Sequence, residues 1–178
     1  MSRINRAVIK AALAGGGVLF VWGVLYWAIL PFHQGVFGEF RDEDAVASVL
    51  TQNASQSGIY IYPGGQDEEA AEKRARGPFA FVVFHPGGMT SMVRPLFTQM
   101  GIQVLGAFLI SLLLGRAGIG GYWGRVGFVV LLLLTAGVLC HLPNWNWWHF
   151  STGYIVLVFA DLLAGGLLAA LVMARIIR

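Results

Sequence analysis

The sequence predicts an all-α membrane protein whose four transmembrane helices carry a small α+β extracytoplasmic segment between the first and the second. Composition is the first reason, because 57% of the 178 residues are hydrophobic and 12% are charged, about half the charge of a typical soluble domain. The second is a set of four long apolar segments: 11–31, 95–115, 126–142 and 152–174. The third is that basic residues flank alternate ends of these segments.

Three of the four segments have the length that a membrane span requires, roughly 20 residues for a hydrocarbon core of about 30 Å. The third is short, because only 15 residues separate Arg125 from His141. We expect it to gain length from Leu142, from a snorkelling Arg125, or from local thinning of the bilayer. Four spans are predicted rather than three, because three would place Arg175 and Arg178 on the wrong side.

The basic residues predict the orientation, because short loops rich in Lys and Arg stay in the cytoplasm. They precede the first segment, separate the second from the third and follow the fourth: Arg3, Arg6, Lys10, Arg116, Arg125, Arg175 and Arg178. Both termini are therefore predicted to be cytoplasmic, with residues 32–94 periplasmic. These residues also account for most of the basic side chains behind the net charge of +3, so no nucleic-acid partner is expected.

The first segment is predicted to remain as a membrane anchor. Its apolar run of about 20 residues exceeds the core of a typical signal peptide. Residues 27–32 also offer no small-residue cleavage site. The predicted organisation is thus residues 1–31 for the N-terminus and first helix, 32–94 for the α+β cap, and 95–178 for helices two to four.

Residues 32–94 contain signals for two helices and two strands. Asp42 can cap a helix that runs through about Gln52, and the acidic-then-basic order of residues 66–76 suits a solvent-exposed helix. Strands are predicted for Gly58–Tyr62 and Phe79–Phe84, since both are β-prone and bounded by Gly and Pro. Two short strands are marginal alone in water, so this cap must lean on the membrane, on helix ends or on another subunit.

The second predicted strand carries apolar side chains on both faces. Phe81 and Val83 point one way, whereas Val82 and Phe84 point the other. We expect the strands to pair with each other, but this pairing leaves a face that something else must bury. A partner could pair with an exposed edge or cover that face.

Asp161 is the only acid inside a predicted span. It lies nine residues below Thr152, about 13 Å at 1.5 Å per residue, and therefore near mid-membrane. A charge there costs several kcal/mol, so we expect it to face the other helices and be hydrogen-bonded, protonated or both. Gln103 and Thr135 reach a similar depth, which predicts a cluster of Asp161, Gln103 and Thr135. This cluster is either a proton or ion station or a structural staple, and the lone acid favours the staple.

The histidines gather at or beyond the outer ends of the predicted spans: His33, His85, His141 and His149. Met89 and Met92 follow His85, and imidazole and thioether groups suit copper or a pair of haem axial ligands. Interfacial histidines among tryptophans are also typical of an aromatic belt. The sequence therefore leaves two interpretations of these histidines open: a copper or haem site, or a structural aromatic belt.

Several motifs of the chain point to one group of proteins. They are Gly77-Pro78-Phe79, Tyr122-Trp123 before Arg125, Asn144–Trp148 followed by Phe150-Ser151, and Phe159-Ala160-Asp161. Together they resemble a group of small four-helix bacterial inner-membrane proteins, and the resemblance covers most of the chain. It implies a bacterial inner membrane and carries no activity.

The predicted function is that of a non-enzymatic accessory or assembly subunit in a larger inner-membrane complex, with the bilayer and other membrane subunits as partners. No arrangement of nucleophile, base and orienting residue is recognisable, and the lone Cys140 cannot support disulfide exchange within the chain. One alternative is a metal- or haem-binding redox protein that uses the outer histidines. Another is a small transporter or proton carrier centred on Asp161.

Overall fold

The computed structural model describes residues 6–177, which form two compact units. The first holds residues up to Phe37 and from Met92 onward, and the second is Gly38–Ser91. Four helices of the first unit are long and apolar enough to cross a membrane: α1 (Arg6–Val24, extended by a π turn to Ile29), α4 (Val93–Ala117), α5 (Tyr122–Trp148) and α6 (Thr152–Ile176). The predicted helical fold with four candidate spans and a small sheet is confirmed. Arg3 and Arg178 lie outside the described residues.

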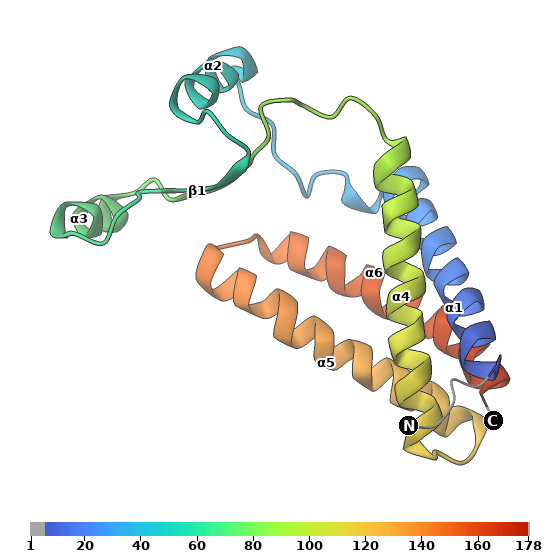
Figure 1. The fold of residues 1–178 in the computed structure, drawn as a ribbon. Helices are drawn as coiled ribbons and strands as arrows, with labels where there is room; N and C mark the ends of the chain where they lie inside the picture. Colours follow the sequence, from blue (N-terminus) through green and yellow to red (C-terminus); the bar gives the residue numbers. More distant parts are fainter. Residues whose placement is uncertain (1–5, 178) are drawn as a thin grey trace. The chain divides into compact units, whose positions relative to one another are not determined.

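Helix α1 is the centre of the first unit. It packs along α4 and along α6, and α6 packs along α5, whereas the consecutive helices α4 and α5 touch little (Figure 1). Small residues allow the close contacts, since a Cβ at Gly16 would lie 2.6 Å from Val104 Cα and one at Gly15 would meet the Met173 side chain. Close backbone approach is how helices associate when lipid supplies no hydrophobic driving force.

One end of the first unit carries the start of α1, the end of α4, the start of α5 and the end of α6. Tyr122 donates from its hydroxyl to the Leu171 carbonyl at 3.0 Å, and Arg125 Nε donates to the Ala174 carbonyl at 3.1 Å. Arg125 thereby satisfies a carbonyl in the last turn of α6, where a cation also suits the helix dipole. Arg94 differs from these basic residues, because it lies in the first turn of α4, at the opposite end.

The third span is longer than the sequence predicted. Helix α5 continues past Leu142 and through Pro143 to Trp148, and it has 27 residues, so the helix gains length at the Leu142 end, which is one of the three expected routes. Proline removes one backbone donor but leaves the following residues free to stay helical, and Asn144 Nδ2 donates to the Cys140 carbonyl at 3.1 Å. The helix ends only at His149, which takes a left-handed conformation with φ 55°.

The second unit contains α2 (Glu43–Asn53), β1 (Gly58–Tyr62), α3 (Glu68–Arg76) and β2 (Ala80–Phe84). The predicted helices and the pairing of the two strands are confirmed, with β2 starting one residue later than expected. The strands are antiparallel and pair Ile59 with Val83 and Ile61 with Phe81.

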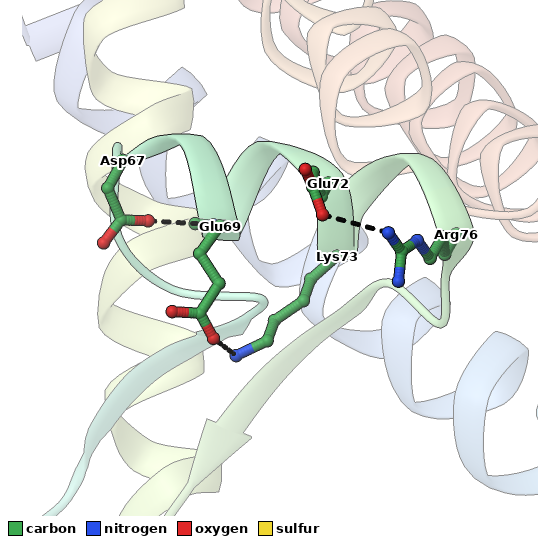
Figure 2. Close-up of polar contacts among 6 residues, drawn as sticks. Asp67, Glu69, Glu72, Lys73 and Arg76 are labelled. Atoms are coloured by element: carbon green, nitrogen blue, oxygen red, sulfur yellow. Dashed lines mark hydrogen bonds and ion pairs between the residues drawn. The ribbon is translucent and has the colours of Figure 1, made fainter.

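An aspartate caps the start of each short helix, and the Asp42 cap was predicted. The Asp42 carboxylate accepts from the Ala45 amide at 2.9 Å, and the Asp67 carboxylate accepts from the Ala70 amide at 2.8 Å. Figure 2 shows the ion pairs along α3, which join Glu69 to Lys73 at 2.6 Å and Glu72 to Arg76 at 2.9 Å. These pairs are exposed, so each adds only a few tenths of a kcal/mol. Local capping and charge order therefore explain why these segments are helical.

The substitution Gly16→Ala is expected to weaken the packing of α1 on α4. The added methyl would meet Val104 backbone, which cannot swing aside as a side chain can, so we expect a loss of about 1–3 kcal/mol of unfolding free energy. Unfolding in detergent, followed by circular dichroism, measures the loss. Gly17→Ala is the matched control, since nothing lies within 4 Å of a Cβ there. An equal loss in both variants would contradict the proposed packing.

Candidate functional site

Asp161 on α6 receives two hydrogen bonds from tryptophans of the first helical segment. Trp22 Nε1 donates to Oδ1 at 2.9 Å, and Trp27 Nε1 donates to Oδ2 at 2.8 Å. Trp22 Nε1 also lies 3.2 Å from the Asp161 carbonyl oxygen. Each carboxylate oxygen therefore has a neutral N–H partner, and the acid joins the first and last candidate spans.

A π turn in the first span brings both tryptophans to this carboxylate. Five residues turn an α-helix by about 500°, so Trp22 and Trp27 would lie about 140° apart around a regular helix. The segment η1 (Leu25–Ile29) is instead a π turn, in which the Leu30 amide donates to the Leu25 carbonyl at 2.8 Å. The wider turn moves side chains five residues apart closer to one face. Both indoles can then reach α6.

Tyr26 and Gly165 complete the contact between the two helices. Tyr26 is 4% exposed, and its hydroxyl donates to the Leu157 carbonyl at 3.0 Å. Gly165 leaves room for Trp22, because a Cβ there would lie 2.5 Å from Trp22 Cδ1. The position of the indole thus depends on a residue without a side chain, one helical turn from Asp161.

A cavity of about 750 Å³ lies beside this carboxylate, between α1, α4, α5 and α6; we name it the Asp161 cavity. Its walls are mostly apolar, and they include both indoles. Four further residues bring polar groups to it, namely Asp161, Gln99, Gln103 and His141. The described lining contains neither Lys nor Arg. An apolar pocket with a few convergent polar groups is the usual form of a small-molecule site.

Two of the three residues of the predicted polar cluster meet at this cavity. Gln103 and Asp161 both line it, whereas Thr135 does not. Thr135 is exposed, and its hydroxyl donates to the Leu131 carbonyl of its own helix at 2.8 Å. The prediction matched the residues by depth alone. Depth along a helix does not fix which face a side chain occupies.

Four residues of the site were not predicted from the sequence: Trp22, Tyr26, Trp27 and Gln99. A signal was present, since buried Trp and Tyr need a partner for their polar atoms, and the first span carries all three aromatic residues within six positions. What the sequence does not reveal is the π turn that aims them at one carboxylate.

The predicted metal ligands divide between the two units. His141 packs edge-on against Phe159, with ring centroids 6.0 Å apart, and lines the Asp161 cavity together with Met92. His85 Nδ1 lies 2.6 Å from Ser57 Oγ in the second unit. The remaining predicted ligands are at the turn after α1, at the end of α5 and in the second unit: His33, His149 and Met89.

Within residues 6–177, no group of three or more His, Cys, Asp or Glu side chains is placed to hold a metal ion. The expected copper or haem ligands include the methionines Met89 and Met92, and that site remains a prediction.

One face of the two-stranded sheet is a second candidate site. Residues paired across antiparallel strands point to the same side, so Ile59, Ile61, Phe81 and Val83 share a face. Ile59 is 65% exposed, Ile61 40% and Val83 75%. We name these four residues the sheet face. The side chains of Ile59, Ile61 and Val83 are left exposed by the helices of their own unit.

No family model, curated protein or solved structure matches this chain at a significant level. The resemblance to small bacterial inner-membrane proteins therefore stays a prediction.

The substitution Gly165→Ala is expected to displace Trp22 and break its hydrogen bond to Asp161. We expect a loss of about 1–2 kcal/mol of unfolding free energy, the size of a hydrogen bond between membrane helices. The unfolding midpoint in detergent measures it. Gly127→Ala on α5 serves as the control, because nothing lies within 4 Å of a Cβ there. A Gly165 variant as stable as the Gly127 variant would show that this close contact is unimportant.

Proposed function

We propose that this chain is a non-enzymatic accessory or assembly subunit of a larger complex in a bacterial inner membrane. The observation that carries the proposal is the exposed sheet face, which belongs to a unit outside the four candidate spans. Exposed apolar side chains are expected on a membrane span, because lipid covers them. Exposure on a unit without spans instead points to a partner.

The chemistry of the sheet face indicates the kind of partner that would bind it. Fully burying a Val or Ile side chain is worth about 1.5–3 kcal/mol, so covering Ile59, Ile61 and Val83 would contribute several kcal/mol to association. The sheet has only two strands within the described residues, and each strand therefore keeps one unpaired edge. A strand of a partner could add to such an edge while its apolar side chains cover the face.

The proposed orientation places both termini in the cytoplasm and the second unit in the periplasm. Seven of the twelve basic residues support this orientation. They lie close to the termini or near the connection between α4 and α5. Of the other five, Lys73, Arg74 and Arg76 lie in α3, well away from the span ends, where charge contributes little to orientation. Only Arg41 and Arg94 oppose the bias from nearby positions.

Reporter fusions test this orientation directly. Fluorescent proteins that mature only in the cytoplasm are expected to be bright at either terminus, because the basic residues favour retention there. With Cys140 replaced by Ser (Cys140→Ser), because it is a free, exposed thiol, a cysteine introduced at Gln66 should react with a membrane-impermeant thiol reagent added outside the inner membrane, whereas one at Gly120 should not. Labelling at Gly120 alone would reverse the proposed orientation.

Crosslinking tests the partner surface. A photo-reactive amino acid at position 83 is expected to attach to one chain of defined mass in intact membranes, and the added substitution Ile59→Asp should abolish that adduct by placing a charge on the apolar contact. Val49 on α2 is the control position, since it is 59% exposed in the same unit but lies off the sheet. Equal adducts at both positions, or none at either, would contradict the proposal.

A further inference from the structure

We propose that the Asp161 cavity binds the ammonium head of an amphiphile that carries a primary amine. This inference is independent of the accessory role, because it rests on the first unit alone. Three properties of the cavity lead to it: its charge, its hydrogen-bonding capacity, and its size and apolar lining.

The charge of the cavity is unbalanced. Among the described residues, Asp161 is the only acid in the lining, which contains no Lys or Arg to pair with it; the imidazole of His141, which also lines the cavity, packs against Phe159. The two groups that bind the carboxylate are neutral indoles. They supply hydrogen bonds without a countercharge. A carboxylate among apolar walls is costly unless a cation accompanies it, so a cationic ligand complements this site better than a neutral or anionic one.

The free acceptors favour a primary ammonium group. A carboxylate offers about four acceptor positions, and the two indoles occupy only two of them. Gln99 and Gln103 line the same cavity with side-chain carbonyl groups that can also accept. A primary ammonium group has three N–H donors for these oxygens, whereas a quaternary ammonium group has none. The two indoles that line the cavity can add cation–π attraction.

The size and lining of the cavity suit an apolar tail. Its volume of about 750 Å³ lies within the usual range for small-molecule sites, about 300–1,000 Å³. Along α4, the lining residues recur at helical spacing, so one face of this helix points at the cavity: Met92, Leu96, Gln99 and Gln103. Leu96 and Met92 lie toward the start of α4, and Val158 and Leu162 of α6 also line the space. A short alkyl chain can fill these apolar surfaces while the head group stays at Asp161.

Calorimetric titration of the full-length protein in phosphatidylcholine nanodiscs tests the proposal, with octylammonium as the probe. We expect saturable binding that is at least 10-fold tighter than for octanol or octyltrimethylammonium. Asp161→Asn should weaken octylammonium binding at least 10-fold, whereas Thr135→Val, at a similar depth but outside the cavity, should leave it unchanged. Equal affinity for octanol, or unchanged binding in Asp161→Asn, would overturn the proposal.

A second variant tests the proposal in case Asp161→Asn does not fold. Gln103→Leu leaves both indole contacts with Asp161 in place and removes one acceptor, so we expect severalfold weaker binding of octylammonium with an unaltered unfolding midpoint. Full affinity in a folded Gln103→Leu protein would contradict the assigned head-group site.

Phosphatidylethanolamine in the nanodisc identifies the source of the amine. Competition with octylammonium would assign the site to the lipid head group, and the absence of competition would assign it to a free amine. Ile59→Asp, which tests the accessory role, should bind octylammonium normally.

Discussion

The contact of one carboxylate with two indoles is the constraint on which the arrangement of the first unit depends. Asp161 is the acid of α6, and its oxygens accept from Trp22 and Trp27. Lipid offers such a group no hydrogen-bond partner, so the chain must supply them. The two donors are five residues apart on one neighbouring helix, and the π turn at Leu25–Ile29 brings them closer to one face. The hydrogen-bonding needs of the Asp161 carboxylate therefore account for a π turn in a helix that is otherwise an apolar span.

This contact also explains why a cavity remains beside it. The first span packs closely against α6 through the two indoles and Gly165, and it packs closely against α4 through the small residues around Gly16. Helices α4 and α5, although consecutive, have little contact with each other. The space between them is bordered by Gln103 and His141 rather than filled by tightly packed side chains. Close packing on two sides of α1 thus leaves an open region on the side of the acid.

Local signals carried most of what the sequence predicted correctly. Asp42 caps its helix as expected, by accepting from the amide three residues later, and the paired strands are bounded by Gly and Pro. The length of α5 was underestimated, because His141 and Pro143 look like the end of a span although the backbone continues through them. Thr135 was misassigned because depth was known but rotation was not. The partners of Asp161 depend on a change of helical period, which no residue in the first span specifies by itself.

Exposed apolar surface has a different meaning in the two units. On α4 or α5, an exposed Leu or Val is the ordinary consequence of a lipid surrounding, so it carries no information about partners. In the second unit, Val83 at 75% exposure lies on a sheet outside the candidate spans. Two strands and two short helices cannot bury both faces of such a sheet. Because this unit is small, one face of its sheet is left for another surface to cover. In the first unit, the polar groups that could bind a ligand lie instead in the Asp161 cavity.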